Sequence, residues 1–295
     1  RDRKRRPEKP FGVLFPSIDA IRDYCLLSSE EEALLRSPQA PIVLARKRRD
    51  ASLADAVAPG NPYLGVMLPA TPLHHLSMAL LQRPMVATSG NRSEEPIVAD
   101  EREALVRLKG IADALLVHDR PIARPVDDSV VLVVERTPEN NEGGEPDKAK
   151  AERIILRRAR GYVPQAIRWG DDSSDGKGQG PILAVGGQLK NTVALLRGNR
   201  VVLSQHLGDL STLEVDAAFR QAVEDLQRLL QVEPQAIACD LHPDYRSTSF
   251  ARELAANLSV PLVPVQHHHA HVASCMAEHR MGGEVLGIAW DGAGY

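Results

Sequence analysis

The sequence is poor in cysteine and has no long apolar run, and each absence excludes a class of protein. Its three cysteines, Cys25, Cys239 and Cys275, are widely separated and form no Cys-x-x-Cys pair. This disfavours a disulfide framework and a cysteine zinc site, so we predict a reducing, cytoplasmic location. No apolar run approaches the roughly 20 residues needed to span a bilayer. A signal peptide would have an apolar segment after its basic start, and no such segment follows Arg1 to Arg6, so no membrane association is predicted.

The sequence also lacks a large net charge and an initiating methionine. A formal charge of −3 gives no general reason to bind polyanions, although the first residues are locally basic. Because the chain starts at Arg1, we expect a fragment or a processed chain. Its 295 residues, 43% of them hydrophobic, are enough for about two domains with real cores.

Two polar stretches divide the chain. Residues 136–152, rich in Glu, Asn, Gly and Lys, separate two apolar runs, which predicts a surface insertion within a domain. Residues 169–180, rich in Asp, Ser and Gly, are predicted to be a linker, because they cannot bury enough apolar surface to offset the entropy lost on ordering. The predicted domains are therefore 1–168 and 181–295.

Short apolar runs alternate with stretches of helical period in both domains, which predicts α/β folds. Ser28, followed by first-turn acids, predicts a helix start. Before the linker the expected strands and apolar runs are 11–15, 41–45, 64–68, 85–87, 114–117, 129–134 and 154–156. After it we expect strands at 182–185, 192–196, 200–204, 236–239, 262–265 and 285–290, and helices at 215–229, 247–258 and 267–280.

The first candidate site combines the basic segment Lys4 to Pro10 with the turn Thr88 to Asn91, each beside a predicted strand. Lysine and arginine can neutralise a triphosphate, and Ser89 and Asn91 can fix its oxygens. The alternative is a solvated basic terminus and an unrelated turn. The adjacent His74 and His75 would diverge by about 100° on a helix and could not share one ion, so we expect one to pack and the other to be solvated. Arginines 157, 158 and 160 could contact phosphate, but a solvated face is the commoner explanation.

The second candidate site is the cluster His267, His268, His269 and His271, which follows the apolar run 262–265. At i and i+4 of a helix, His267 and His271 share a face and could supply two imidazoles to a divalent metal. The other two histidines point elsewhere, where they could hydrogen-bond to a metal ligand or contact a substrate. A solvated polar turn is the alternative.

Glycine turns accompany this cluster. Gly186 to Thr192 and Asp291 to Gly294 each follow an apolar run, and such turns let backbone N–H groups approach phosphate, with Lys190 or Asp291 serving a nucleotide or its Mg²⁺. Together with the element order, the paired turns suggest the actin-like ATPase architecture.

The amino-terminal strings resemble the YrdC/Sua5 fold and, more narrowly, the YrdC-like domain of the HypF family of hydrogenase-maturation carbamoyltransferases. These strings are 4–10, 72–76, 88–93, 118–122, 127–130 and 156–164. The resemblance implies a twisted open α/β domain in which Lys4, Arg6, Ser89 and Asn91 contact ATP and the carbamoyl group. Arg124 and Ser129 are further nucleotide-binding candidates by the same match.

The carboxy-terminal strings resemble the Kae1-like domain of the same family, which implies the first lobe of an actin-like ATPase. The strings are 186–192, 203–210, 239–245, 265–274 and 290–295. The resemblance implies that His267 and His271 bind Fe or Zn and that Asp240, His242 and Asp244 lie near the transfer site. It makes Lys190, Asn191, Asp291 and Gly292 nucleotide-site candidates. Ala293 stands where many relatives have Thr, and the family continues beyond Tyr295 with a further acidic ligand.

The resemblance implies a two-step reaction. Carbamoyl phosphate or carbamate and ATP, with Mg²⁺, would give carbamoyl adenylate, and the carbamoyl group would pass to the carboxy-terminal cysteine of a HypE-type partner. The family places acylphosphatase and zinc-binding segments before this region, so we expect no activity here with carbamoyl phosphate as sole donor. Two alternatives stay open: a small-molecule O-carbamoyltransferase of antibiotic biosynthesis, and a non-catalytic RNA-binding module. RNA binding is disfavoured because the basic terminus lacks interleaved aromatics.

Overall fold

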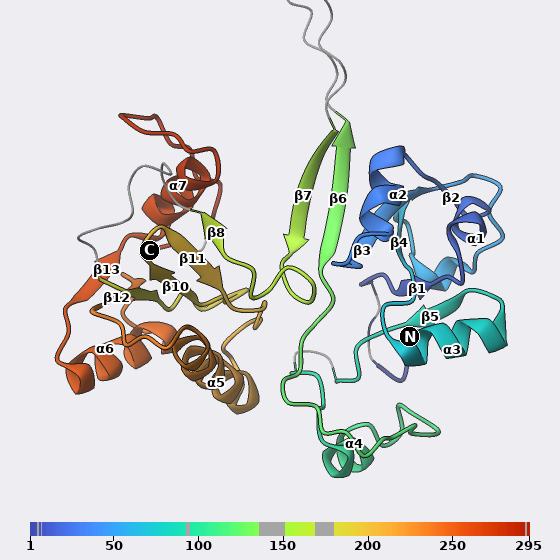
Figure 1. Ribbon diagram of the computed structural model, residues 1–295, viewed down its shortest axis with the longest axis horizontal. Helices are drawn as coiled ribbons and strands as arrows, with labels where there is room; N and C mark the ends of the chain where they lie inside the picture. The colour runs from blue at the N-terminus through green and yellow to red at the C-terminus, as the bar shows by residue number, and fades with distance from the viewer. Residues whose placement is uncertain (5, 7, 93–94, 136–150, 169–179, 293) are drawn as a thin grey trace, which may run out of the picture. The chain divides into compact units, whose positions relative to one another are not determined.

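The computed structural model describes residues 1–4, 6, 8–92, 95–135, 151–168, 180–292 and 294–295 (Figure 1). Apart from a short segment at 94–96, its contacts divide into one compact unit that ends at Tyr162 and a second from Val163 to Tyr295. Most of the predicted insertion and linker lies outside the described residues. The α/β fold class is confirmed, because each unit contains one sheet with helices against it.

The first unit is built on a seven-stranded mixed sheet in the order β5-β1-β4-β3-β6-β7, with β2 paired to β3. Strand β1 runs parallel to β4, and β3 runs parallel to β6, while the other pairs are antiparallel. The strands are β1 (Gly12–Leu14), β2 (Cys25–Leu26), β3 (Ile42–Lys47), β4 (Tyr63–Met67), β5 (Met85–Ala87), β6 (Val130–Glu135) and β7 (Ala151–Arg157).

The four α-helices in the described part of the first unit begin at residues whose side chains cap them. Ser28 accepts from the Glu31 N–H while the Glu31 carboxylate accepts from the Ser28 N–H, so the predicted helix start is confirmed as a full capping box. Asp100 caps α4 through two N–H groups. The helices are α1 (Ile18–Arg22), α2 (Ser29–Leu35), the short 3-10 helix η1 (Asp55–Val57), α3 (Pro72–Leu81) and α4 (Glu101–Arg107).

The second unit has a six-stranded sheet in the order β13-β12-β9-β10-β11-β8. Strands β9, β12 and β13 are parallel to one another, whereas β10, β11 and β8 pair antiparallel. In Figure 1, α5 and α6 lie together on one side of this sheet and α7 on the other. The elements are β8 (Ile167–Arg168), β9 (Ile182–Ala184), β10 (Ala194–Arg197), β11 (Arg200–Leu203), α5 (Leu213–Leu230), β12 (Ala236–Asp240), α6 (Arg246–Leu258), β13 (Leu262–Val265) and α7 (His267–Glu278).

Helix α5 covers its sheet with the predicted apolar stripe. Val215, Phe219, Ala222 and Leu226 are buried, and Phe219 meets Phe250 of α6 edge-on with ring centroids 5.0 Å apart. Leu229, the last predicted member of the stripe, is half exposed at the end of the helix. The stripe therefore anchors α5 and α6 to the same core.

Two predicted strands are wrong. Residues 114–117 and 285–290 form no strand in the described chain, and Leu116, Leu286 and Trp290 remain 79%, 93% and 97% exposed. An apolar run becomes a strand only where a neighbour satisfies its backbone hydrogen bonds, and neither run pairs with another described segment. The predicted first domain, 1–168, also includes β8 at 167–168, whereas in the structure β8 pairs with β11 of the second unit.

Candidate metal and anion sites

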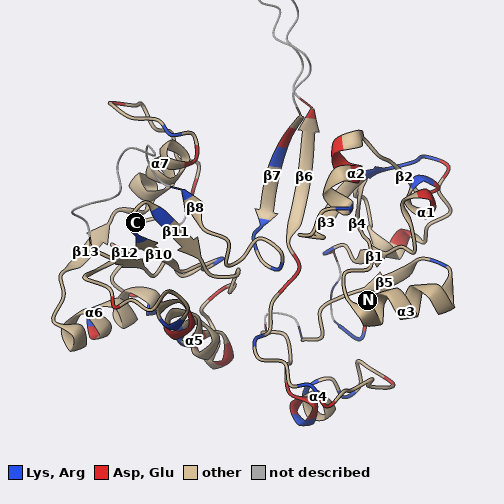
Figure 2. Cartoon of the chain, viewed as in Figure 1, with Lys and Arg blue, Asp and Glu red and all other residues tan. Residues whose placement is uncertain are grey.

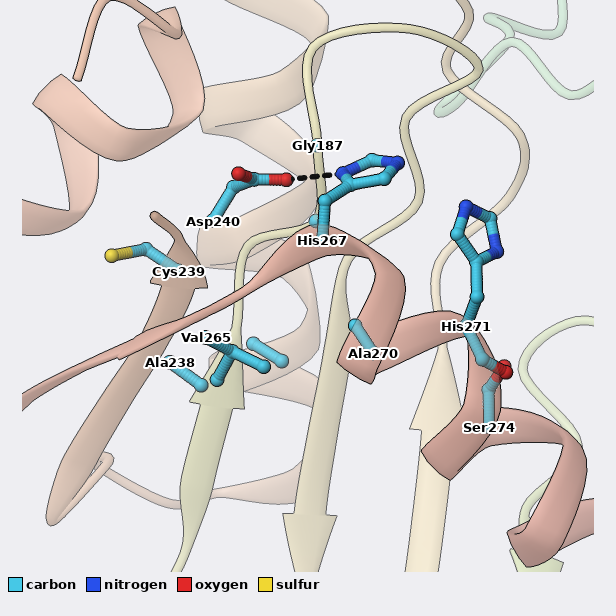
Figure 3. Close-up of a pocket in the computed structure, with 11 residues that line it drawn as sticks. Gly187, Ala238, Cys239, Asp240, Val265, His267, Ala270, His271 and Ser274 are labelled. Carbon is cyan, nitrogen blue, oxygen red and sulfur yellow. Dashed lines mark hydrogen bonds and ion pairs between the residues drawn. The ribbon is translucent and has the colours of Figure 1, made fainter. Parts of the chain in front are cut away.

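The histidine cluster lies where three parallel strands end. Strand β12 ends at Asp240, β13 leads through Gln266 into α7, and β9 leads into the turn at Gly186 and Gly187. Because these strands are parallel, their carboxyl ends meet at one edge of the sheet, where α/β proteins usually bind ligands. The residues at this edge line a pocket, which Figure 3 shows.

Asp240 and His267 form the central contact of the pocket. The His267 Nδ1 atom lies 2.5 Å from the Asp240 Oδ2 atom, and Figure 3 shows the two side chains pointing towards each other. This hydrogen bond, opposed by partial burial, raises the pKa of the His267 imidazole above its ordinary value. With Nδ1 donating to a carboxylate, Nε2 is the ring atom left to meet a metal.

His267, His271 and Asp291 form a group of three metal-type donors. Their ligand atoms all lie within 4.8 Å of one another, with Asp291 Oδ2 at 2.9 Å from His267 Nε2 and 3.3 Å from His271 Nε2. Two imidazoles and one carboxylate match the donors of catalytic zinc and non-haem iron sites. The residues therefore fit a divalent transition metal, and Asp291, predicted as a nucleotide contact, stands among the metal donors.

The remaining histidines of the cluster have different neighbours. His268 Nε2 lies 3.0 Å from the Asp291 carbonyl oxygen, and its Nδ1 accepts a bond of 3.0 Å from the Gln266 side chain. His269 is exposed. Helix α7 carries almost no Lys, Arg, Asp or Glu (Figure 2), so histidines dominate its chemistry.

His242 lies just beyond Asp240 but takes part in a different set of contacts. Its ring stacks on Tyr245 with centroids 4.0 Å apart, and its Nδ1 atom accepts from the Asp244 N–H at 3.2 Å. Asp244 itself is exposed. The Tyr295 ring meets His242 edge-on at 5.3 Å, and the Tyr295 carbonyl accepts from the His267 N–H.

The glycine turn after β9 is held from inside. Asn191 is 1% exposed, and its amide donates to the carbonyls of Val185 and Gly187. Gly186 has a φ of +70°, and a side chain there would meet the Thr192 carbonyl at 2.5 Å, so the turn requires glycine. Of the predicted nucleotide contacts in this region, Asn191 is thus buried under the turn. Lys190 and Gly292 are exposed.

The amino-terminal candidates come together in the first unit. The Lys4 ammonium donates to the Ser89 carbonyl at 2.5 Å and lies 3.4 Å from Asn91 Oδ1. The Ser89 hydroxyl donates to the same Asn91 oxygen at 2.7 Å. The Thr88 hydroxyl accepts from both Lys4 and Arg6, at 3.3 and 3.0 Å. Four predicted residues therefore gather around the turn that follows β5.

The cations at this site are held close to one another. Burial, with the neighbouring Arg6, lowers the pKa of the Lys4 amine. Burial, with the nearby Arg157 and Arg1, likewise lowers the pKa of the Arg6 guanidinium. The nearby Asp127 carboxylate opposes both shifts in part, and the gathered cations make this a candidate site for an anionic group.

The other predicted residues of the first unit lie elsewhere. Ser129 is 0% exposed and uses its hydroxyl within the fold, donating to the Arg160 carbonyl and accepting from the Ala159 N–H. Arg124 is exposed. His74 is half-buried and His75 exposed, the division predicted for this pair.

The three arginines near β7 contact the protein itself. Arg157 donates to the Asp128 carbonyl, Arg158 donates to the Tyr162 carbonyl, and Arg160 forms an ion pair with the Asp128 carboxylate at 2.7 Å.

The described residues include no helix long and apolar enough to cross a membrane.

Comparison with known proteins assigns both units. Residues 1–142 match the Sua5, YciO and YrdC family model described as "Telomere recombination", and residues 177–278 match the one described as "HypF Kae1-like domain". The carbamoyltransferase HypF of Synechocystis sp. is 46% identical over the whole chain. The carbamoyltransferase HypF2 of Cupriavidus necator is 44% identical over the same span. The chain belongs to the HypF family.

Solved HypF structures agree with this assignment. A crystal structure of full-length HypF in the phosphate- and nucleotide-bound form is 42% identical, with a TM-score of 0.86 over all of this chain and 43% of its own. T. kodakarensis HypF gives the same TM-score at 35% identity, over 36% of its own chain. The chain spans 36% of the length of each of the two curated HypF relatives. The family resemblance and the YrdC-like and Kae1-like folds expected from the sequence are confirmed.

Sequence reasoning missed two relationships in this HypF-family chain. It did not pair Asp240 with His267, although a strand, helix, strand order places the ends of two parallel strands side by side. It also predicted Asp291 as a contact for the nucleotide or its Mg²⁺ and did not place it beside His267 and His271, where it lies in the structure. The i, i+4 histidine spacing carried no information about either acid, because both are distant in sequence.

Proposed function

We propose that this chain contains the ATP-activating and carbamoyl-transfer parts of a hydrogenase-maturation carbamoyltransferase. The observation that carries the proposal is the His267, His271 and Asp291 group at the carboxyl edge of the second sheet, within a chain whose relatives are named carbamoyltransferase HypF. We assign the unit that ends at Tyr162, with the predicted insertion 136–152, to adenylate formation and the unit from Val163 to Tyr295 to transfer.

In the first step, a carbamate oxygen attacks the α-phosphorus of ATP, and pyrophosphate leaves with the broken bond's electron pair. Lys4 and Arg6 neutralise charge that develops on the phosphates, and Mg²⁺ accompanies the nucleotide. Ser89 and Asn91 orient the acid, because both lie on the turn that Lys4 contacts. The phosphate and nucleotide bound in the full-length HypF crystal structure support a nucleotide site.

In the second step, the carboxy-terminal cysteine of a HypE-type partner gives its proton to solvent and its sulfur attacks the carbamoyl carbon, and AMP leaves with the electron pair of the broken carbon–oxygen bond. His267, His271 and Asp291 would hold a divalent transition metal, Fe or Zn, which supplies Lewis-acid polarisation of the carbonyl when bound. We assign Lys190 and the backbone at Gly292 to contacts with the nucleotide, and His242 to the transfer step. The acceptor remains a thiol that comes from outside this chain.

Exchange of labelled pyrophosphate into ATP, with fresh carbamate as the acid, tests adenylate formation on the 295-residue chain. We expect exchange in the wild type and a loss on the order of 10²-fold in Lys4→Ala, as for removal of one charge-stabilising donor. Lys109→Ala, an exposed lysine of the same unit, is the matched control and should exchange normally.

Metal content is measured on the same proteins. Lys4→Ala should keep the wild-type metal stoichiometry, whereas the double variant His267→Ala, His271→Ala should lose it. Absence of exchange in the wild type with carbamate would refute the adenylation role. Unchanged metal content in the double variant would refute the metal role.

A further inference from the structure

Both oxygens of the Asp240 carboxylate are engaged within the protein. Its side chain is 5% exposed, Oδ2 accepts from His267 Nδ1 at 2.5 Å, and Oδ1 accepts from the His242 N–H at 2.9 Å. A carboxylate fixed in this way is poorly placed to exchange a proton with a substrate. Its contacts point instead to a role that acts through His267.

We propose that Asp240 is a positioning residue that sets the orientation of His267, so that Nε2 faces His271 and Asp291. This inference rests on the metal site of the proposed function. Histidine ligands of metals commonly donate their second ring N–H to a carboxylate, which fixes the tautomer and makes the ring a better donor. The His267 ring shows this arrangement, with Asp240 on one nitrogen and Asp291 on the other.

Several elements hold Asp240 in place. It is the last residue of β12 and lies opposite Val265 of β13 in the parallel ladder. Val265 precedes His267 by two residues, so the ladder brings Asp240 close to His267. The Thr248 hydroxyl of α6 donates to its carbonyl at 3.0 Å. The carboxylate therefore approaches His267 from a strand end that is fixed by both a neighbouring strand and a helix.

The glycine turn after β9 completes the support. A Cβ atom on Gly187 would lie 3.5 Å from His267 Cε1 and 3.7 Å from Asp240 Oδ2, so the backbone of Gly187 packs directly against the pair. The buried Asn191 amide holds this turn through the Gly187 carbonyl at 2.6 Å. Figure 3 shows Gly187 beside the Asp240 and His267 side chains. Rotation of the imidazole is thus opposed by a hydrogen bond on one side and by packing on another.

Zinc affinity of the 295-residue chain, measured by competition with a chelator, tests the proposal. Asp240→Ala should weaken zinc binding by about 10–100-fold, the usual effect of removing such a partner. Asp240→Asn keeps the side-chain size and an acceptor for the His242 N–H but loses the charge, so we expect a smaller loss. Glu253→Gln removes an exposed acid of the same unit and should leave the affinity unchanged.

Two further measurements separate positioning from a general structural role. The visible spectrum of bound Co²⁺ should change in Asp240→Asn and not in Glu253→Gln, because only the former alters a ligand's orientation. In the His267→Ala background, adding Asp240→Ala should weaken zinc binding further by less than about twofold, because Asp240 would act through the imidazole that this variant lacks. Fully additive losses would overturn the proposal.

The outcomes distinguish this inference from the proposed function. If the wild type binds zinc and both Asp240 variants bind it equally well, the positioning role is wrong while the metal site stands. If the wild type binds no zinc or cobalt, the metal site fails and the positioning role fails with it. Circular dichroism establishes that each variant is folded, and if Asp240→Ala is not folded, Asp240→Asn decides the question.

Discussion

Burial separates the three cysteines at the scale of single residues. Cys25 and Cys239 are 1% and 4% exposed within the cores of the two units, whereas Cys275 is exposed on α7. Desolvation, with the nearby Glu31, raises the pKa of the Cys25 thiol to about 12 from an ordinary 9.0. Because only the thiolate is nucleophilic, we expect Cys275 to be the reactive cysteine.

Alkylation with iodoacetamide at pH 8 should therefore label Cys275 quickly and Cys25 and Cys239 only after unfolding in urea. Mass spectrometry of the digested protein identifies the sites. Since folding raises the pKa of Cys25, its burial stabilises the fold fully below about pH 9, and this contribution declines as the pH rises towards 12. Rapid labelling of Cys25 in the folded chain would contradict its placement.

Caps determine where helices begin at the scale of elements. Ser28 and Glu31 satisfy each other's backbone N–H groups at the start of α2, and the buried Leu34 and Leu35 attach that helix to the first core. Gln266 has the corresponding position at α7, where its side chain accepts from the His269 N–H at 2.7 Å. The cap of α7 thus fixes the first turn of the helix that carries His267.

Substitution Ser28→Ala removes one half of the capping box and should lower the free energy of unfolding of the first unit by about 1 kcal/mol. Urea denaturation followed by circular dichroism measures this change. Ser29→Ala, one residue further along at an exposed position, is the matched control and should change stability much less. Equal effects of the two substitutions would show that the cap contributes nothing.

The whole molecule contains separate hydrophobic cores. One is centred on Phe15 and Val43 and another on Phe219 and Leu195, and their members come from different units. Separate cores allow separate unfolding transitions. The candidate anion site then depends on the first core and the candidate metal site on the second.

Truncation of Phe219 to Ala should destabilise the second unit by about 3–5 kcal/mol, because Phe219 is fully buried. Calorimetry should show a lower transition temperature for the second unit and an unchanged one for the first. Pyrophosphate binding should persist in this variant under conditions where zinc binding is weakened. A parallel shift of both transitions would show that the units unfold as one.

The sequence by itself determined the α/β class, most strands and helices, the capping of α2 and the pairing of His267 with His271. Each depends on local periodicity, on a capping residue or on i, i+4 spacing, which are properties of neighbouring residues. The gathering of Lys4, Arg6, Ser89 and Asn91 was expected from the family resemblance, and the structure places these residues together.

Only the tertiary structure decided what completes each site. The parallel pairing of β12 with β13 brings Asp240 to His267, and the return of the chain brings Asp291 to both histidines. The runs 114–117 and 285–290 looked like strands but found no partner among the described segments. Contacts between residues far apart in sequence depend on strand order and chain path, which local patterns do not encode.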